Sequence, residues 1–558
     1  MFFGKDNSAR VFATRSPSQE FDHPLARRGF GRGLRGLFPD RRGWPSHLAG
    51  RQRAEPNTPG ILVPFPLRSG QPPMAQHPPN PPHLVVIGGG LAGLAAAESL
   101  AAEPVGGKRP RITLLEAGSR LGGVIETVGY DGWLVERSAD SFLAARPEGI
   151  GLVSRLGLED ELVSVSPTVR RALVWSERAG GAAGRLVPVP AGFRLLAPGR
   201  IRGVLTSPLL SWPARLRLAA ERFVPARSRV REAEDDESLE SFAVRRLGRA
   251  AFDHLVQPLV SGIWTADPAR LSMAAACPEF LAMERDQGSL SRGEWLRLQA
   301  AGTAAVAQGA RYGQFVSFRQ GMQTLIDGLS RRLAATGVEV LFKPVTSLRA
   351  EPSGWRLELP DGAVIDADGI VMAVPSRVAS DLLKPVAPVL AAELGGIEVA
   401  GAAIVSLGFT REQVSQPLDA AGMVVPRASG RRLLAASFSS SKFAGRAPAG
   451  MVLMRGFIGG ALDPGIAGLT DQEVVDLVRA ELAAMLGIRG QPALVQIDRW
   501  HEAMPQYHVG HCRRVARIQI AEASLPGFGL AGAAYTGVGI PQVIESGQRA
   551  ARLAAGRR

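Results

Sequence analysis

The feature that most constrains the fold is the stretch HLVVIGGGLAGLAAAESLAA at residues 83–102. An apolar run of strand length leads directly into a glycine-rich turn and then into an alanine-rich helical segment. Gly88, Gly90 and Gly93 have the spacing GxGxxG, which permits a tight turn, a close backbone approach to a pyrophosphate, and close packing of helix on strand. We therefore expect a strand–turn–helix unit of a parallel sheet that binds a dinucleotide. Its predicted contacts are Gly88, Gly90, Leu91, Ala92 and Gly93.

A second strand is predicted at residues 111–117, RITLLEA. It ends in Glu116 and Ala117, and Glu116 lies 23 residues past Gly93. An acidic side chain at this distance binds a ribose 2′-hydroxyl. Because a carboxylate repels a 2′-phosphate, the sequence favours FAD or NAD over NADP.

The residues after Glu116 separate FAD from NAD. They read AGSRLGGVIET, which places Arg120, Gly122 and Gly123 in an ExxxRxGG pattern. This pattern resembles the extension found in a large class of flavoproteins that includes amine oxidases, phytoene desaturases and porphyrinogen oxidases. The resemblance implies that Arg120 and the glycine pair run along the diphosphate and ribityl chain of FAD.

Two later segments are expected to complete the cofactor domain. Residues 337–376 alternate apolar and polar positions over several short strands. The resemblance implies that Val345 in this segment contacts the adenine through its backbone. Residues 530–547, LAGAAYTGVGIPQVIESG, read as a strand, a turn and a helix, so the turn would present backbone amides where the reduced flavin gathers negative charge. The residues assigned to this end of the cofactor are Gly532, Gly537, Val538 and Gly539.

Four stretches narrow the resemblance to the protoporphyrinogen and coproporphyrinogen oxidases of haem biosynthesis. They are residues 258–290, 311–329, 498–511 and 532–547, and the likeness runs from about residue 83 to 555. It implies that FAD takes hydride from a porphyrinogen in three rounds, six electrons in all, and that molecular oxygen reoxidises the flavin to give hydrogen peroxide. The motif GVGIP favours coproporphyrinogen III as substrate, and protoporphyrinogen IX stays open.

The substrate of such an enzyme is flat, apolar and fringed with propionates, so it needs an apolar slot with a cation at its edge. Arg171 aligns with the propionate-binding arginine of the family, and Arg170 is the alternative one residue earlier. Gly262 and Thr265, in SGIWTADP, match a loop beside the substrate. Met423 matches a strand over the opposite face. No side chain is assigned a catalytic role, because the flavin itself abstracts the hydride.

Three features depart from the family or carry an alternative interpretation. Residues 136–142 read ERSADSF where relatives often have ERGPDSF, and this loop is expected near the flavin. Ala421 stands where some relatives have phenylalanine. Trp500 is assigned to the cofactor site, although a buried tryptophan is more often part of a core.

The composition excludes several other functions. The chain is 46% hydrophobic and 21% charged, which suits a large globular core. Its two cysteines, Cys277 and Cys512, give neither a disulfide framework nor a metal site, so no metal is predicted. Half of the net charge of +14 lies in residues 1–82, which also hold fourteen of the 41 prolines. We predict that this segment is disordered, and that the chain does not bind nucleic acid. Whether translation begins at Met1 or at Met74 is left open.

The predicted fold is α/β: a discontinuous Rossmann-like, glutathione-reductase-type FAD-binding domain with an α+β substrate domain and a helical subdomain. The predicted divisions are a tail (1–82), FAD-binding parts (83–165, 311–380 and 498–558), a substrate-binding and helical region (166–310) and a second substrate-binding part (381–497).

The helical region carries the prediction about location. Residues 207–223, SPLLSWPARLRLAAERF, have Ser207 and Ser211 as expected N-caps, and arginines gather there. This basic amphipathic face either contacts anionic lipid, as the resemblance implies, or is a solvated face over a core stripe. No run of 18 uncharged apolar residues exists, so no membrane span is predicted. We expect a cytoplasmic protein, monomeric or homodimeric, in peripheral contact with the inner face of the cell membrane, with a ferrochelatase as partner.

Two other functions are alternatives to a porphyrinogen oxidase. A flavin amine oxidase would usually flank the flavin with aromatic residues, and this chain has only four tyrosines. A non-catalytic flavin- or porphyrin-binding protein is favoured only by the altered loop at residues 136–142.

Overall fold

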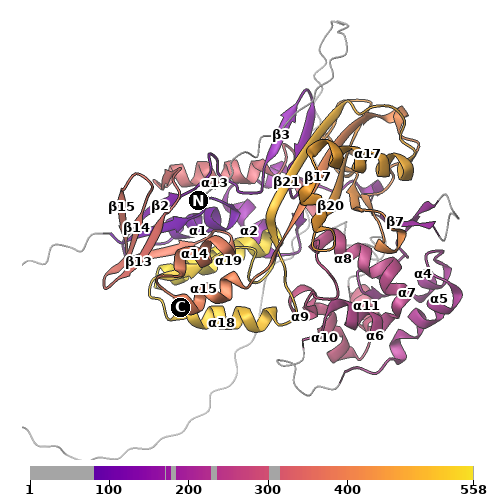
Figure 1. Cartoon of the computed structure of the whole chain (residues 1–558), viewed down its shortest axis with the longest axis horizontal. Helices are drawn as coiled ribbons and strands as arrows, with labels where there is room; N and C mark the ends of the chain where they lie inside the picture. The colour runs from indigo at the N-terminus through magenta and orange to yellow at the C-terminus, as the bar shows by residue number, and fades with distance from the viewer. Residues whose placement is uncertain (1–80, 170, 178–183, 228–235, 301–314, 557–558) are drawn as a thin grey trace, which may run out of the picture. The chain divides into compact units, whose positions relative to one another are not determined.

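Five parallel strands from three separate parts of the chain form one sheet. The computed structural model describes residues 81–556 apart from 170, 178–183, 228–235 and 301–314. The strand order is β12, β2, β1, β16, β22, and every neighbouring pair is parallel. Figure 1 labels β2 of this sheet. The bounds are β1 (His83–Ile87), β2 (Arg111–Leu115), β12 (Glu339–Leu341), β16 (Gly369–Met372) and β22 (Phe528–Leu530). The predicted α/β class is confirmed. The predicted tail lies outside the described residues except for Pro81 and Pro82.

Each face of this sheet is covered by a different layer, because alternate residues of a strand point to opposite faces. Leu84 and Val86 pack against helices α1 (Leu91–Ala102), α13 (Gln323–Ala335) and α19 (Ile540–Ala554). Val85 and Ile87 pack against an antiparallel layer and two helices. That layer consists of β13 (Ser347–Glu351), β14 (Gly354–Glu358), β15 (Val364–Ala367), α14 (Ser376–Leu383) and α15 (Pro388–Gly395).

A second sheet of seven strands has the order β21, β17, β20, β19, β18, β7, β8. Only the β18–β7 pair is parallel. Helix α17 (Asp471–Leu486) packs on one face, where Val405, Leu407 and Phe409 join its apolar side chains in a core. The bounds are β7 (Ala172–Ser176), β8 (Arg185–Pro188), β17 (Val399–Thr410), β18 (Gly422–Val424), β19 (Leu433–Ser437), β20 (Met451–Gly459) and β21 (Leu494–Pro505).

A helical subdomain lies between the first two parts of the parallel sheet in the chain. Its main elements are α4 (Ile201–Thr206), α5 (Trp212–Ala219), the 3₁₀ turn η4 (Ala220–Phe223), α6 (Leu239–Leu247), α8 (Gln257–Trp264), α10 (Pro278–Gln287) and α11 (Leu290–Ala300). The predicted helix start at Ser211 is confirmed, with Pro213 in its first turn. The predicted start at Ser207 is wrong, since Ser207 instead ends α4.

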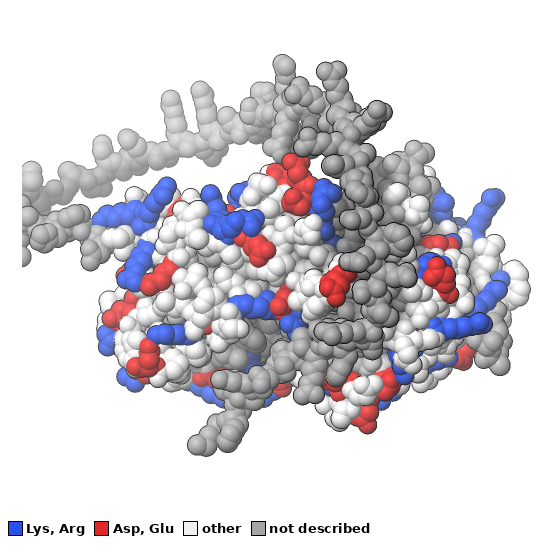
Figure 2. Space-filling view, turned by 90° about the horizontal axis from the view of Figure 1, so that it is seen from above, with Lys and Arg blue, Asp and Glu red and all other residues white. Residues whose placement is uncertain are grey.

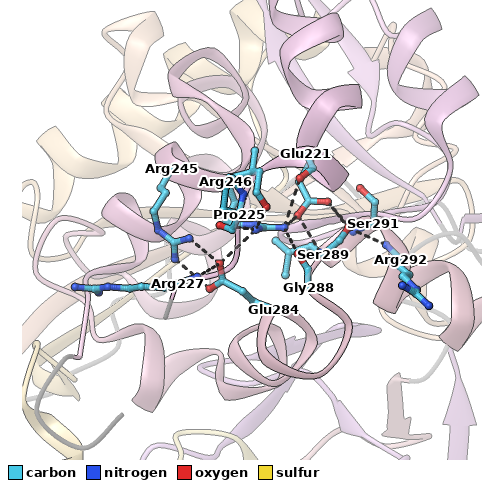
Figure 3. A network of polar contacts seen from close by, with 12 residues as sticks. Glu221, Pro225, Arg227, Arg245, Arg246, Glu284, Gly288, Ser289, Ser291 and Arg292 are labelled. Atoms are coloured by element: carbon cyan, nitrogen blue, oxygen red, sulfur yellow. Dashed lines mark hydrogen bonds and ion pairs between the residues drawn. The ribbon is translucent and has the colours of Figure 1, made fainter. Parts of the chain in front are cut away.

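A buried ion network holds this subdomain together (Figure 3). The side chains of Arg246 on α6 and Glu221 on η4 are both fully buried and paired with each other. Glu221 also accepts hydrogen bonds from Ser289 Oγ at 2.8 Å and from the backbone N–H of Leu290 at 2.9 Å. Glu284 on α10 takes a second N–H of Arg246 at 3.3 Å. Removing one partner of such a pair leaves an uncompensated buried charge, which costs about 3–5 kcal/mol.

Two surface properties bear on location. Among the described residues, none of the helices is both long enough and apolar enough to cross a membrane. On the face drawn in Figure 2, basic and acidic residues are interspersed, so the positive charge of that face is not gathered into one patch.

Candidate cofactor and substrate site

The glycine-rich turn between β1 and α1 meets two different requirements. A Cβ on Gly88, whose φ is +104°, would lie 2.4 Å from the carbonyl oxygen of Ala373, and one on Gly93 would lie 1.8 Å from that of Gly88. These two positions must be glycine for the protein to pack. A Cβ on Gly90 would meet only Gly123 Cα, at 3.9 Å, among the described atoms within 4 Å. Gly90 therefore leaves the N-terminus of α1 open, which suits a pyrophosphate. Leu91 and Ala92 are buried in the first turn of α1.

Glu116 directly follows β2 and is fixed beside the same turn. Its Oε2 accepts the backbone N–H of Gly89 at 2.6 Å, and its Oε1 accepts that of Gly118 at 2.7 Å. Ala117 follows it and is exposed. The carboxylate thus stands at the carboxyl end of β2 next to the open helix N-terminus, where the sequence predicted a ribose contact.

The predicted Gly122–Gly123 pair lies opposite the first turn. Gly122 N–H donates to the carbonyl of Gly89 at 2.8 Å, and a Cβ on Gly123 would come within 3.2 Å of Gly90 Cα. Both glycines have positive φ, +106° and +59°. Gly90 and Gly123, 33 residues apart in sequence, therefore form one wall without side chains, as close approach of an extended ligand requires.

The Arg120 side chain hydrogen-bonds to the backbone of the loop that contains the second glycine turn. Its guanidinium donates to the carbonyls of Leu121 and Ile125, each at 3.0 Å, and to that of Gly123. It also pairs with Glu126 at 3.1 Å. In this structure the arginine is committed to the 121–126 loop, so its contribution to a bound diphosphate would come from its charge and its remaining N–H capacity.

The third glycine turn connects β22 to α19. A Cβ on Gly532 would meet no described atom within 4 Å, and Gly539 is the N-cap of α19. Val538 is half-buried against the helical subdomain. The expected free amide of Gly537 is not what the structure shows, because its N–H donates to the Tyr507 hydroxyl at 2.8 Å. The tyrosine thereby fixes the turn.

Two further residues that were predicted to contact the cofactor, Val345 and Trp500, lie outside the glycine turns. Val345 lies between β12 and β13, half-buried against the core behind the parallel sheet. Trp500 on β21 donates its Nε1–H to the Arg137 carbonyl at 2.8 Å. It thereby joins the seven-stranded sheet to the ERSADSF loop.

An ion network that sequence reasoning missed holds the ERSADSF loop. Asp140 accepts from Lys442 Nζ at 2.7 Å and lies 3.5 Å from the Arg455 guanidinium, which also donates to the Ser138 carbonyl. Burial opposes ionisation of Asp140, but Lys442 and Arg455 outweigh it and hold its pKa well below the usual range. The sequence feature that could have indicated this network is Arg455, a single charged residue within the apolar strand MVLMRGFIG.

The same loop is tied to the cofactor turns through Arg137. Its Nε donates to Asp498 Oδ1 at 2.6 Å, and its other N–H groups reach Glu126, the partner of Arg120. Burial raises the pKa of Asp498 in spite of Arg137 beside it. A chain of alternating charges therefore runs from the second glycine turn to the face of the seven-stranded sheet.

Gly262 and Thr265 lie together at the end of α8. A Cβ on Gly262 would stand 3.6 Å from Val424 Cγ1 and from Ala435 Cβ, and Gly262 is exposed. Thr265 has φ of +45°, and its buried Oγ1 has no hydrogen-bond partner among the described residues. An unsatisfied buried hydroxyl costs about 1–3 kcal/mol, so it points to an absent ligand or water at this place.

Met423 is not brought to the same place as Gly262. Its side chain is buried in the core against α17, on the opposite face of the seven-stranded sheet. Its neighbour Val424 is the residue that faces α8. The sequence motif located the strand correctly. Because side chains alternate between the two faces of a strand, Val424 and not Met423 faces α8.

Arg171 stands half-exposed at the start of β7. Its guanidinium pairs with the Asp419 carboxylate, and its Nε donates to the Asp419 carbonyl at 3.2 Å. An exposed pair of this kind is worth about 0–1 kcal/mol, so Asp419 competes only weakly with a substrate carboxylate. The alternative, Arg170, lies outside the described residues. Within the described ranges, no group of three or more His, Cys, Asp or Glu side chains could hold a metal.

The glycine turns, the acidic residue after β2 and the two sheets define the class of this protein. The flavin containing amine oxidoreductase family matches residues 91–555, and the chain belongs to it. This confirms the predicted flavin cofactor.

Within this family, the chain is similar to individual porphyrinogen oxidases over most of its length. The chain is 35% identical over 471 residues to coproporphyrinogen III oxidase of Bacillus subtilis, covering 84% of this chain and 97% of that one. It is 31% identical to the chloroplastic protoporphyrinogen oxidase of Nicotiana tabacum, with 83% of each chain covered. The predicted resemblance is confirmed.

Two solved structures are similar to this chain over most of its length. A crystal structure from Exiguobacterium sp. 255-15, described as a candidate protoporphyrinogen oxidase, has a TM-score of 0.72 at 29% identity and covers 85% of this chain and 98% of that one. A putrescine oxidase structure, at 16% identity and a TM-score of 0.60, covers 86% of this chain and 99% of that one and shares the fold.

Proposed function

We propose that this protein is an oxygen-dependent porphyrinogen oxidase that uses FAD to convert coproporphyrinogen III to coproporphyrin III. The observation that carries the proposal is the side-chain-free wall of Gly90 and Gly123 in a chain that spans 97% of a coproporphyrinogen III oxidase. The relatives include both coproporphyrinogen and protoporphyrinogen oxidases, so protoporphyrinogen IX is the second candidate substrate.

The reaction removes six electrons and six protons. Over three rounds a hydride leaves each of three carbon bridges, and three protons leave as well, two from pyrrole nitrogens and one from the fourth bridge. In each round one O₂ takes up the electron pair of the hydride together with two protons and becomes H₂O₂. Bound FAD supplies the two-electron acceptor. The residues of this chain bind, orient and exclude water. We assign the pyrophosphate to the N-terminus of α1 beside Gly90, and the ribose to Glu116.

The substrate slot is assigned to the exposed edge where α8 meets the seven-stranded sheet, at Gly262. Gly262 lets the flat ring system approach the backbone, and Val424 and Ala435 supply apolar contact. The unpartnered Thr265 Oγ1 offers a polar contact, and Arg171 offers a cation for a propionate. Met423 supports the slot from behind through the core.

We further propose that the parallel sheet with its β13–β15 layer is a glutathione-reductase-type FAD-binding domain, divided from the rest of the chain at the boundaries expected from the sequence. The glycine turn at the carboxyl end of β1 and the antiparallel layer support this assignment.

The helical subdomain is proposed to contact the cytoplasmic face of an anionic membrane. Trp212, Leu216 and Phe223 are 64%, 60% and 73% exposed on one stretch of α5 and η4. Arg215 stacks over Trp212 at 4.9 Å, and Arg222 over Phe223 at 4.8 Å. Aromatic side chains beside arginine suit the headgroup layer of an anionic leaflet. The buried Glu221–Arg246 pair holds η4 rigidly beneath them (Figure 3).

Vesicle flotation tests the membrane contact. Leu216→Ser with Phe223→Ser should reduce binding to phosphatidylglycerol vesicles at least tenfold. Val389→Ser, which removes a side chain that is 74% exposed on α15, is the matched control. Equal flotation of the two variants would rule out this surface.

Product transfer completes the proposal. A cytoplasmic enzyme, monomeric or homodimeric, would deliver its poorly soluble porphyrin to a ferrochelatase. The decisive test of the reaction uses the FAD-loaded protein in air with coproporphyrinogen III, protoporphyrinogen IX and putrescine in separate arms. We expect porphyrin fluorescence above autoxidation in the first arm, with three H₂O₂ per porphyrin. Oxidation of putrescine alone would reassign the chain to the amine oxidases.

A further inference from the structure

A cavity of about 400 Å³ lies at the start of helix α18 (His511–Ala523), and none of its lining residues belongs to the glycine turns or to the proposed substrate slot. Three chain segments form it: residues 396–398 after α15, Arg270 after α8, and residues 506–517. Four of its lining residues are arginines, and one, Glu398, is acidic. The cavity has no role in the cofactor or substrate site described above.

The arginines of this cavity are incompletely neutralised. Arg270 is paired with Glu398 through two contacts, at 2.5 and 3.1 Å. Arg514 and Arg517 share a single carboxylate, that of Glu393. The exposed guanidinium of Arg513 makes no hydrogen bond or ion pair with any residue that the structure describes. Within the described ranges, four guanidinium groups thus meet the carboxylates of Glu393 and Glu398.

The two other carboxylates nearby are outside the cavity lining and already engaged. Asp236 accepts from Ser272 Oγ at 2.7 Å and from the Gly510 N–H at 2.8 Å. Asp267 accepts the Ala269 N–H at 2.9 Å. Neither carboxylate makes an ion pair with Arg513 within the part of the chain that the structure describes.

Burial disfavours the charged form of both lining histidines. Burial and then the neighbouring Arg270 lower the pKa of His508, and its Nδ1 accepts an Arg270 N–H at 3.2 Å. The pKa of His511 is lowered to about 4, mainly by burial. The cavity also has a buried hydrogen-bond acceptor, since Gln506 is only 4% exposed and its Oε1 has no partner among the described residues; this oxygen suits a hydroxyl of the molecule that carries the phosphoryl group and not the phosphoryl oxygens.

We propose that this cavity binds a phosphorylated small molecule through its dianionic phosphoryl group. A planar guanidinium presents paired N–H donors that match phosphate oxygens, and Arg513 with the half-neutralised Arg514 and Arg517 supplies about two unmatched charges. A monocarboxylate would leave one of those charges unmatched. The volume exceeds that of free phosphate, so the phosphoryl group has room to be carried on a larger molecule.

The cavity is one side chain away from the third glycine turn. His511 donates its Nε2–H to the Tyr535 carbonyl at 3.0 Å, and its ring stacks on Tyr507 with centroids 3.9 Å apart. Tyr507 in turn accepts the Gly537 N–H. Occupancy at the cavity is therefore positioned to alter the turn that is assigned to the flavin.

Calorimetric titration of the full-length, flavin-loaded protein at constant ionic strength tests the site. The probes are inorganic phosphate, AMP and acetate, with phosphatidic acid vesicles in a separate arm. We expect phosphate or AMP to bind at least tenfold more tightly than acetate, and Arg513→Gln to lose at least tenfold in affinity. Arg552→Gln, which removes an exposed arginine in the last turn of α19, should bind like the native protein.

Each outcome decides something. AMP binding tighter than phosphate identifies a small phosphorylated ligand, whereas binding only to vesicles overturns this in favour of a lipid headgroup. Equal affinities of native protein and Arg513→Gln, or no binding at millimolar phosphate, overturn the site. These results do not depend on porphyrinogen turnover, so failure here is distinguishable from failure of the proposed function. A phosphate-dependent change of the flavin absorbance in native protein, absent from Arg513→Gln, supports transmission through Tyr507.

Discussion

Replacing Gly90 by alanine should separate folding from cofactor binding. Gly90 has φ of −70° and ψ of 176°, a conformation open to any residue, and its new Cβ would have 3.9 Å to the nearest described atom, Gly123 Cα. The apoprotein should therefore be as stable as the native one, or more stable by about 0.4–1 kcal/mol, because alanine lowers the entropy of the unfolded chain. The methyl group would occupy the space assigned to the pyrophosphate.

We expect FAD affinity to fall about 30-fold in Gly90→Ala, which corresponds to about 2 kcal/mol. Flavin fluorescence quenching on titration into apoprotein measures the affinity, and urea unfolding of the same apoprotein measures stability. Gly468→Ala is the matched control, since a Cβ there meets no described atom within 4 Å and the residue is far from the glycine turns in sequence. Unchanged FAD affinity in Gly90→Ala would refute the assignment of this wall to the cofactor.

Further predictions concern the loop network and the slot. Asp140→Asn should destabilise the protein by about 3–5 kcal/mol in urea unfolding at pH 7, because Lys442 and Arg455 would be left without their buried counter-charge. Since the folded pKa of Asp140 is depressed, its contribution is present above the unfolded value of about 3.9 and is lost as pH falls below it. The difference between native protein and Asp140→Asn should therefore shrink below about pH 4, and a constant difference would contradict the ionised state. Thr265→Val should leave stability unchanged or raise it by up to about 3 kcal/mol, because it removes a buried hydroxyl that has no described partner, while raising KM for the porphyrinogen; an unchanged KM would remove Thr265 from the proposed slot.

The parts of the fold that sequence predicted correctly are those encoded locally. The spacing of Gly88 and Gly93 reflects contacts with backbone a few residues away or on the neighbouring strand, and strand periodicity follows from a run of apolar residues. The same reasoning misplaced Met423 relative to the slot because its direction depends on register within the sheet, which one residue of phase reverses. It also missed the role of Tyr507, whose partner Gly537 lies 30 residues further along the chain.

The ERSADSF loop shows why part of the site could not be predicted. Residues 138–139 lack the Gly-Pro pair that the resemblance led us to expect, and proline would have stiffened this backbone by itself. In this chain, residues outside the loop fix its backbone. Arg455 donates a hydrogen bond to the Ser138 carbonyl, and Lys442 donates one to the Asp140 carboxylate. Lys442 ends the short helix α16 (Ser439–Lys442) and Arg455 lies in β20, both about 300 residues downstream, so no local sequence pattern predicts these contacts.

This arrangement has a consequence for the relation between the two sheets. Arg137, in the same loop, joins Glu126 of the second glycine turn to Asp498 of β21, and Trp500 of β21 donates to the Arg137 carbonyl. The loop is thus fixed at once to the glycine turns proposed to bind the cofactor and to the seven-stranded sheet where the substrate slot is proposed. Because buried charge pairs tolerate little displacement before they lose their compensation, the network fixes the spacing between the two walls more tightly than apolar packing alone would. Orientation of a flat substrate against a flat acceptor depends on that spacing, so these charges act on the reaction as positioning groups.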